Sequence, residues 1–193
     1  MFVIRQMSRV DFAIVSDGPI SMAFLENGIS SFQAAAVFIR DLPYRRNSNR
    51  DDPFTVFTDR CGTCSTKHAL LKRLADENEA HGFELTLGIF RMNGKNTPEV
   101  GTILTRHTLD FIPEAHTYLR YGDELIDVTK ATPIPFIDDL LDEIEIAPDE
   151  ITDYKISYHK TFFEEWLMKN SNIPYSIAEL WAIREECIKA LSA

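Results

Sequence analysis

The pattern of apolar and polar positions predicts two helices in the first half of the chain. Residues 32–40 are rich in good helix formers, follow two serines that can each cap a helix, and are stopped by Pro43. A second helix is expected from Thr63, as its cap, to about Glu79. Its buried stripe consists of Leu70, Leu71 and Leu74.

The middle of the chain alternates with period two and predicts strands. Apolar residues at every second position indicate a half-buried strand over residues 83–89. Two more strands are expected over 115–121 and 125–128, joined by Gly122-Asp123, where glycine stands first as a type II′ turn prefers. These two strands therefore form an antiparallel hairpin.

The C-terminal part of the chain returns to helical patterns. One helix carries Phe163 and Trp166, and the last begins at Ser176, whose capping box is completed by an acid three residues later. Cys187 falls on the apolar face of this last helix and is expected in the core. Residues 138–153 hold eight acids and no base, and we expect a solvated face there.

Composition restricts the class of protein. A length of 193 residues predicts a single domain over 1–193 with a sizeable core. The net charge of −10 disfavours nucleic acids and anionic membranes as partners. No apolar run approaches the roughly 20 residues that span a bilayer, and apolar residues precede the first arginines, unlike in a signal peptide. Three cysteines favour a reducing compartment, so we expect a cytoplasmic protein.

Three residues suggest chemistry. Cys64 opens the second predicted helix, His116 enters the second strand, and Asp127 lies in the third. A nucleophile, a base and a group that orients the base are what a thiol-based acyl-transfer enzyme needs. The N-terminus of a helix lowers the pKa of a cysteine and offers backbone N–H groups to an oxyanion.

The hairpin register adds geometry to this hypothesis. With a two-residue turn at Gly122-Asp123, His116 lies opposite Thr129. Asp127 is then its diagonal neighbour on the same face, within reach of a hydrogen bond. A one-residue change in the loop would move Asp127 to the other face, so the inference depends on that turn.

These motifs resemble the transglutaminase-like superfamily. The matching segments, within residues 43–130, are Gly62-Thr63-Cys64 with Ala69-Leu70-Leu71, then Ala115-His116, then Asp127-Val128-Thr129. The resemblance implies a papain-like α+β fold, in which the nucleophile helix packs on an antiparallel sheet with flanking N- and C-terminal helices. It also implies that Cys64 is the nucleophile, His116 the base and Asp127 the orienter. The position after the histidine, often aromatic in that superfamily, is Thr117, and Gln33 is a candidate to assist the oxyanion.

The resemblance implies attack on an amide or ester carbonyl through a thioester intermediate. The expected substrate is a peptide or a small amide or ester, and water or an amine resolves the intermediate. The reaction requires no cofactor and no metal. A catalytically inactive binding module with the same fold is an alternative, as transglutaminase-like folds need not be active.

A redox function is a second alternative. Cys61-Gly62-Thr63-Cys64 is a C-x-x-C motif, which in a thioredoxin-like thiol-disulfide oxidoreductase follows a strand. Residues 54–58 are the candidate strand, and Pro113 is the candidate for the proline that faces the dithiol. His116 and Asp127 have no role in this hypothesis.

Zinc binding and anion binding are two further hypotheses. Cys61, Cys64 and His68 have ligand chemistry, but the chain holds no second paired cluster. His68 lies one turn after Cys64 and is either solvated or placed to tune the thiolate. The polar loop over 44–53, which carries Arg45, Arg46 and Arg50, is either a solvated loop or a rim that attracts anions beside the site.

Overall fold

The computed structural model has an α+β fold. It describes residues 10–132 and 135–191, and of residues 3–5 it describes the backbone only. The contacts divide the chain into two compact units. Unit 1 consists of Met1–Leu87, Thr117–Pro133 and Ile144–Thr152, and unit 2 consists of Gly88–His116, Ile134–Glu143 and Asp153–Ala193. The single domain expected from the length of the chain remains a prediction.

Five strands among the described residues form a sheet in the order β1-β4-β3-β2-β5. Their bounds are Val3–Arg5 for β1, Phe83–Met92 for β2, Ile112–Tyr121 for β3, Glu124–Ile126 for β4 and Leu140–Glu145 for β5. Four of them are antiparallel, and β1 adds to β4 in parallel. The sequence pattern indicated β2, β3 and β4 but neither edge strand. The strand expected over residues 83–89 is confirmed as β2, but its expected half-burial was wrong, because β2 is buried at nearly every position.

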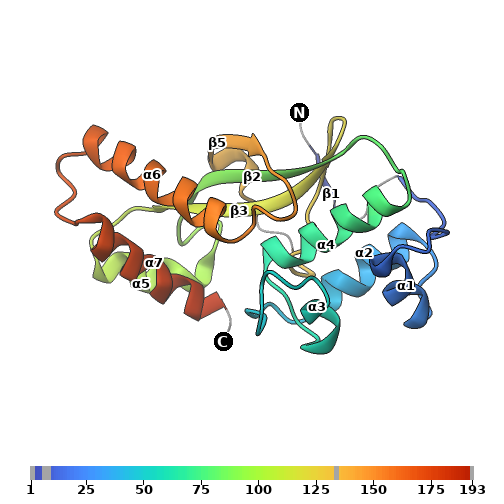
Figure 1. Ribbon diagram of the computed structural model, residues 1–193. Helices are drawn as coiled ribbons and strands as arrows, with labels where there is room; N and C mark the ends of the chain where they lie inside the picture. Colours follow the sequence, from blue (N-terminus) through green and yellow to red (C-terminus); the bar gives the residue numbers. More distant parts are fainter. Residues whose placement is uncertain (1–2, 6–9, 133–134, 192–193) are drawn as a thin grey trace. The chain divides into compact units, whose positions relative to one another are not determined.

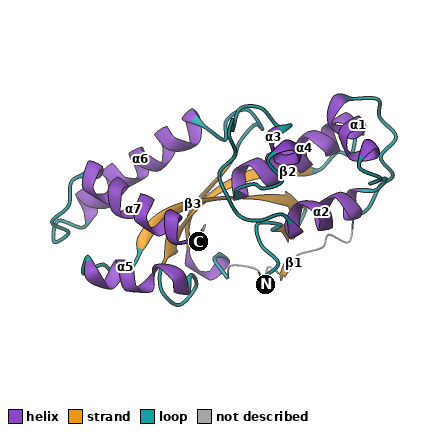
Figure 2. Cartoon of the chain, turned by 90° about the horizontal axis from the view of Figure 1, so that it is seen from below, coloured by secondary structure: helices purple, strands orange, loops and turns teal. Residues whose placement is uncertain are grey.

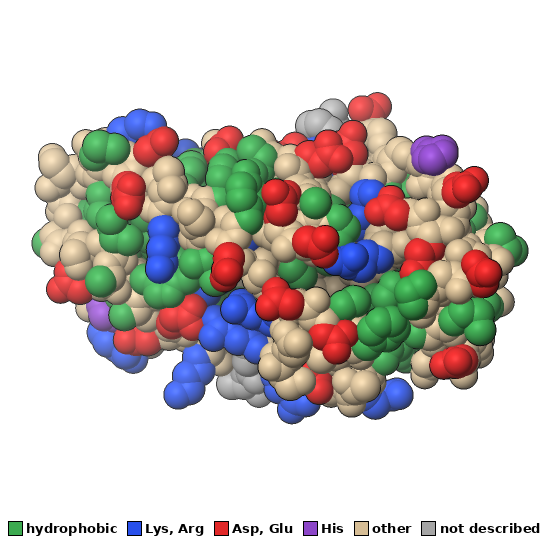
Figure 3. Space-filling model, viewed as in Figure 1, with side chains coloured by type: hydrophobic (Ala, Val, Ile, Leu, Met, Phe, Trp, Pro, Cys, Tyr) green, Lys and Arg blue, Asp and Glu red, His purple; other side chains and the backbone are tan. Residues whose placement is uncertain are grey.

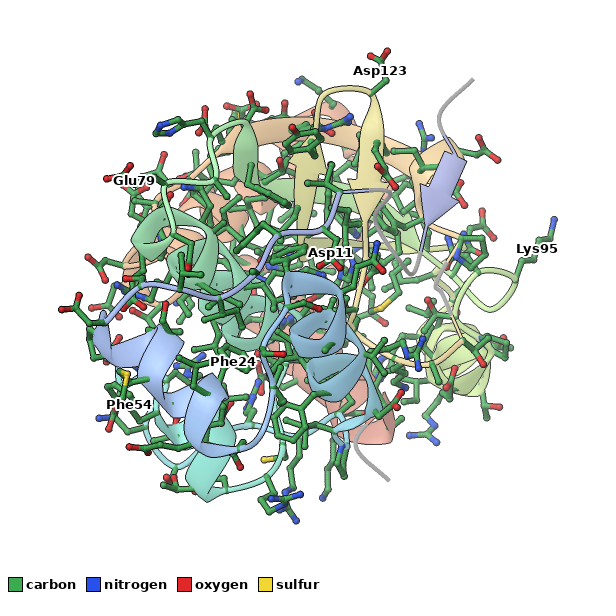
Figure 4. All side chains as sticks on the ribbon, turned by 90° about the vertical axis from the view of Figure 1, so that its right-hand side faces the viewer. Asp11, Phe24, Phe54, Glu79, Lys95 and Asp123 are labelled. Atoms are coloured by element: carbon green, nitrogen blue, oxygen red, sulfur yellow. The ribbon has the colours of Figure 1, made fainter. Side chains whose placement is uncertain are left out.

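The β3–β4 hairpin has the expected turn. Tyr121 pairs with Glu124 and Leu119 with Ile126, as a two-residue loop requires. Gly122 has a φ of 54°, a conformation that favours glycine, and Asp123 lies at the tip of the hairpin (Figure 4). Strand β4, the third strand that the sequence predicted, ends at Ile126 and is shorter than predicted.

Unit 1 holds four helices among its described residues, and they gather together in Figures 1 and 2. They are α1 over Pro19–Glu26, α2 over Phe32–Asp41, α3 over Thr55–Thr58 and α4 over Cys64–Glu77. Helix α4 contacts the other three and packs on the sheet. Ser31, one of the two serines that the sequence offered as caps, caps α2 by accepting a hydrogen bond from the Ala34 N–H. Phe24 fills the interior between the helices (Figure 4).

Unit 2 is built mainly from helices. Its described elements include the 3-10 turns η1 over Pro98–Val100 and η2 over Ile137–Asp139, with α5 over Gly101–Arg106, α6 over Asp153–Lys169 and α7 over Ile177–Leu191. Helix α7 contacts α5, α6 and η1.

The last helix has the expected cap and core. Ser176 and Glu179 form the predicted capping box, in which each side chain accepts from the other's backbone N–H. Cys187 is fully buried, and burial raises the pKa of its thiol to about 12. Cys187 is therefore a core residue, as predicted. Trp166 and Trp181 are only half-buried.

Charged side chains cover the visible surface in a mixed pattern. Figure 3 shows Asp and Glu side chains spread over this face and interspersed with Lys and Arg. The acidic stretch after residue 138 includes the edge strand β5, whose positions are all at least partly exposed, as expected of a solvated face. Among the described residues, no helix has both the length and the apolar character needed to cross a membrane.

Candidate active site

Cys64 is the first residue of α4, a helix of 14 residues. Thr63 is its N-cap and Thr66 completes a capping box, in which the Thr63 N–H donates to Thr66 Oγ1 at 2.9 Å and the Thr66 N–H donates to Thr63 Oγ1 at 3.4 Å. The Cys64 side chain is buried, at 6% exposed. The structure thus confirms the predicted helix start, which is where backbone N–H groups and the helix dipole favour a thiolate.

The polar loop before the helix holds the turn that leads to Cys64. The Gly62 N–H donates to the Pro43 carbonyl at 3.1 Å, and the Arg45 N–H donates to the Gly62 carbonyl at 3.2 Å. Asn47 is buried, donates to the Cys61 carbonyl at 2.9 Å and accepts from Thr66 Oγ1 at 2.8 Å. Asn47 is therefore part of the site architecture, although sequence reasoning placed it only in a polar loop.

The arginines of this loop point outward. Arg45, Arg46 and Arg50 are all exposed, while Asn47 between them is buried. The exposed arginine side chains agree with a solvated loop, and the backbone of the loop is hydrogen-bonded to the turn that precedes Cys64. Binding of an anion by these arginines remains a hypothesis.

Lys67 is buried in unit 1, and sequence reasoning missed it. Its Nζ donates to the carbonyls of Leu42 at 2.6 Å, Thr129 at 2.8 Å and Arg40 at 3.4 Å. Burial lowers the pKa of this lysine to about 8, and the nearby Asp127 and Cys64 partly oppose the shift. The signal in the sequence was its spacing, since Lys67 lies one turn from both Cys64 and Leu71 on the buried face of the helix.

His68 is fully buried, so the expectation that it is solvated was wrong. Its Nε2 accepts from the Val128 N–H at 2.9 Å, and its Nδ1 lies 2.7 Å from the Cys64 carbonyl oxygen. An amide N–H can only donate and a carbonyl can only accept, so this pattern requires a neutral ring with the proton on Nδ1. His68 therefore links the start of α4 to the segment that follows β4.

Asp127 is buried in the same unit. Its Oδ1 accepts from the Thr129 N–H at 2.9 Å and lies 3.6 Å from Nε2 of His68. Because the hydrogen-bond pattern of His68 requires a neutral ring, these two side chains do not form an ion pair. Asp127 does interact with the positive charge of Lys67 in unit 1. Unit 1 thus brings Cys64 and Asp127 to one buried polar cluster through Lys67 and His68.

His116 belongs to unit 2. It is buried and lies edge-to-face against the rings of Phe136, at 4.6 Å between centroids, and Phe90, at 6.1 Å. The next residue, Thr117, belongs to unit 1 and is fully buried, with its Oγ1 3.2 Å from Oγ of Ser65. The structure therefore describes two of the three predicted catalytic residues within one unit, and the complete triad remains a prediction.

The alternatives based on the C-x-x-C motif find little support. Residues 54–58, the strand expected for a thioredoxin-like fold, contain the short helix α3, so that expectation was wrong. Neither Cys61 nor Cys64 forms a disulfide, and both are buried. Among the described residues, no group of three or more His, Cys, Asp or Glu side chains is placed to hold a metal ion. Both ring nitrogens of His68 already have backbone partners.

Gln33 lies in the first turn of α2. Its backbone N–H donates to Oδ1 of Asp11 at 2.9 Å, and it lines an open surface groove with Asp11 and Phe38. Cys64 is not among the residues of that groove. These contacts give no support to a role for Gln33 at the oxyanion.

Comparison of the chain with protein-family models, with curated proteins and with solved structures found no match. The resemblance to transglutaminase-like proteins therefore depends on the short motifs around Cys64, His116 and Asp127. The site itself offers a cysteine at a helix N-terminus beside a buried, hydrogen-bonded polar cluster.

Proposed function

We propose that this protein is a cysteine-dependent acyl-transfer enzyme of papain-like, transglutaminase-like form. Cys64 is the nucleophile, His116 the general base and Asp127 the residue that orients the base. The observation that carries the proposal is the position of Cys64 at the first residue of α4, with Asp127 buried in the same polar cluster. A helix N-terminus supplies both a lowered thiol pKa and donors for an oxyanion.

The proposed reaction has two stages. His116 takes the proton of the Cys64 thiol, the thiolate attacks the carbonyl carbon of an amide or ester, and the resulting oxyanion accepts hydrogen bonds from N–H groups at the start of α4. Collapse of this intermediate breaks the bond to the leaving group, which takes a proton from His116, and leaves a thioester on Cys64. Water attacks the thioester to give hydrolysis, or an amine attacks it to give transfer, and His116 accepts the proton of the attacking group.

The buried cluster supports this chemistry electrostatically. Lys67 carries a positive charge close enough to interact with both Cys64 and Asp127. A nearby cation favours a thiolate, and burial strengthens the interaction by excluding water. Substrates of the proposed enzyme are peptides or small amides and esters.

The test is the reaction of Cys64 with iodoacetamide and with an activated ester, mapped by mass spectrometry from pH 5 to 10. The wild type is compared with Cys61→Ser, His116→Ala and Asp127→Asn, and with His81→Ala, which changes an exposed histidine. We expect rapid labelling of Cys64 at neutral pH and an acyl adduct on Cys64. Labelling and formation of the acyl adduct should both persist in Cys61→Ser and decline by about 100-fold in His116→Ala.

Three results would contradict the proposal. A requirement for both cysteines, with no effect of His116, would favour redox chemistry. Slow labelling of Cys64 at every pH, with no acyl adduct, would favour an inactive binding module. An equal effect of His116→Ala and His81→Ala would exclude His116 as the base.

A further inference from the structure

Lys67 is the most unusual buried group in the described part of unit 1. A lysine side chain is almost never fully buried, because removing an ammonium from water is unfavourable unless it is fully hydrogen-bonded. Lys67 has an exposed fraction of 0%, and all three of its donors meet carbonyl oxygens. Every donor of the Lys67 ammonium is therefore hydrogen-bonded. Its positive charge still needs a negative charge to balance it.

The carbonyl partners of Lys67 come from two separate segments. Arg40 lies near the end of α2, and Leu42 follows it. Thr129 lies beyond β4, two residues after Asp127. Lys67 thus joins the end of α2 and the Asp127 segment to the helix that begins with Cys64.

The balancing charge is Asp127. Thr129 lies between the two side chains, since its carbonyl accepts from Lys67 Nζ at 2.8 Å and its N–H donates to Asp127 Oδ1 at 2.9 Å. The titratable groups that act on Lys67 are Asp127 from the segment after β4, Cys64 from α4, Asp41 from α2 and Cys61 from the turn before α4. All four favour the charged form of the lysine.

We propose that Lys67 is a positioning residue of this site, whose ammonium fixes residues 127–129 against α4 and supplies the positive charge that balances Asp127 and the Cys64 thiolate. This inference rests on the proposed acyl-transfer function for its role in catalysis. Its structural part, the link between Lys67 and the Asp127 segment, stands without that function.

The inference predicts a pH signature in the wild-type protein. The pKa of Lys67 is lowered to about 8, so the ammonium loses its proton near that pH. The neutral amine has one donor fewer and no charge, which weakens the hydrogen bonds to Leu42 and Thr129. The backbone amide signals of Val128 and Thr129 should therefore shift between pH 7 and pH 9 with the same midpoint as the Lys67 side chain.

The decisive experiment compares Lys67→Met with Lys72→Met. Lys72 is on the same helix, but it forms an i,i+4 ion pair with the exposed Asp76, so its variant controls for loss of a lysine from α4. Iodoacetamide labelling of Cys64 is measured against pH for both variants and for Lys67→Arg, with circular dichroism as a check on folding. We expect Lys67→Met to shift the labelling midpoint upward by about one pH unit, which is roughly a tenfold lower rate at neutral pH. Lys72→Met should leave the profile unchanged, and Lys67→Arg should restore part of the shift.

The outcomes separate this inference from the proposed function. A folded Lys67→Met variant with the wild-type labelling profile would overturn the inference and leave acyl transfer intact. Slow labelling in the wild type would overturn acyl transfer, and the nuclear magnetic resonance titration of wild-type protein labelled with ¹³C at the lysine ε-carbon would still test the link. The same titration tests the link between Lys67 and residues 127–129 if Lys67→Met does not fold. A Lys67 signal that titrates near the ordinary value of about 10.4, with no matching shift in Val128 or Thr129, would overturn the inference.

Discussion

Each unit buries a cluster of ionisable side chains, and the two clusters use their hydrogen bonds differently. In unit 2, Arg184 binds Glu114 in a bidentate pair, with Nε to Oε2 at 2.8 Å and Nη2 to Oε1 at 2.6 Å. In unit 1, Lys67 and His68 bind backbone atoms instead. The cluster of unit 2 neutralises itself through side chains, whereas the cluster of unit 1 fixes segments of backbone.

In the unit 2 cluster, Arg184 stabilises the charged form of Glu114, which burial alone would disfavour. Burial by itself raises the pKa of Glu114, but the charge and hydrogen bonds of Arg184 outweigh it, so this pKa lies below its usual value. Arg184 also lies over the ring of Trp181, at 5.2 Å from its centroid. Nearby, His159 is buried, and Nε2 lies 2.8 Å from the Pro113 carbonyl oxygen. Burial lowers the pKa of His159 to about 4.

The unit 1 cluster organises a segment that carries a predicted catalytic residue. Its partners include the Cys64 carbonyl, the Val128 N–H and the Thr129 carbonyl. Loss of His68 from this cluster frees a backbone segment, whereas loss of Arg184 in unit 2 leaves an unpaired charge. The hydrogen-bond partners of a buried polar group, rather than its burial alone, therefore indicate its role.

The largest expected effect breaks the pair in unit 2. Arg184→Met leaves the Glu114 carboxylate buried without its partner, and we expect a loss of about 3–5 kcal/mol in the free energy of unfolding. Denaturant unfolding measures it, with Arg106→Met as control because the ion pair of Arg106 with Glu186 is exposed. A double variant, Glu114→Leu with Arg184→Met, should be more stable than Arg184→Met alone. Equal losses for Arg184→Met and Arg106→Met would show that breaking the buried pair costs no more stability than breaking the exposed pair.

A smaller effect is expected from His68→Leu in unit 1. Leucine fills a similar volume but leaves the buried Val128 N–H without an acceptor, which costs about 2 kcal/mol. The same unfolding experiment measures the change, and His81→Leu serves as the exposed control. If His68→Leu unfolds like the wild type, the backbone link between α4 and residue 128 does not contribute to stability.

His159 of unit 2 should make the free energy of unfolding depend on pH. The folded pKa of His159, about 4, lies below the ordinary value of 6.5, so the unfolded chain binds more protons between these values. His159 therefore lowers stability as the pH falls from 6.5 to 4, by up to about 1.4 kcal/mol per pH unit. His159→Gln keeps a donor but cannot titrate and should lose this slope, while His81→Gln should keep it. An unchanged slope in His159→Gln would assign the acid sensitivity to other groups.

The smallest expected effect concerns the loop that supports Cys64. Asn47→Ala removes the bridge between the Cys61 carbonyl and Thr66, and we expect a loss of about 1 kcal/mol in the free energy of unfolding. Asn49→Ala, at an exposed position of the same loop, should change stability by less than about 0.5 kcal/mol. Thermal melting of both variants is the measurement. A larger loss for Asn49→Ala than for Asn47→Ala would contradict the role given to Asn47.

Local signals predicted the elements that the site depends on. Thr63 was recognised as a helix cap, and Ser31 as one of two candidates, because such side chains satisfy backbone donors within three residues. The β3–β4 turn followed from glycine at the first position of a two-residue loop. Edge strand β1 was not recognised, because its three residues carry no pattern long enough to detect.

By itself, the sequence determined where the candidate nucleophile lies, at the start of a helix, because capping is a local interaction. Only the tertiary structure decided that Lys67 and His68 are buried and bind the segment around Asp127. Apart from the Cys64 carbonyl, one turn before His68, their partners lie 25 to 62 residues away along the chain, and no local rule relates such positions. Helical periodicity marks a face as buried, but it cannot specify which backbone atoms a buried polar side chain will meet, since those atoms are supplied by packing.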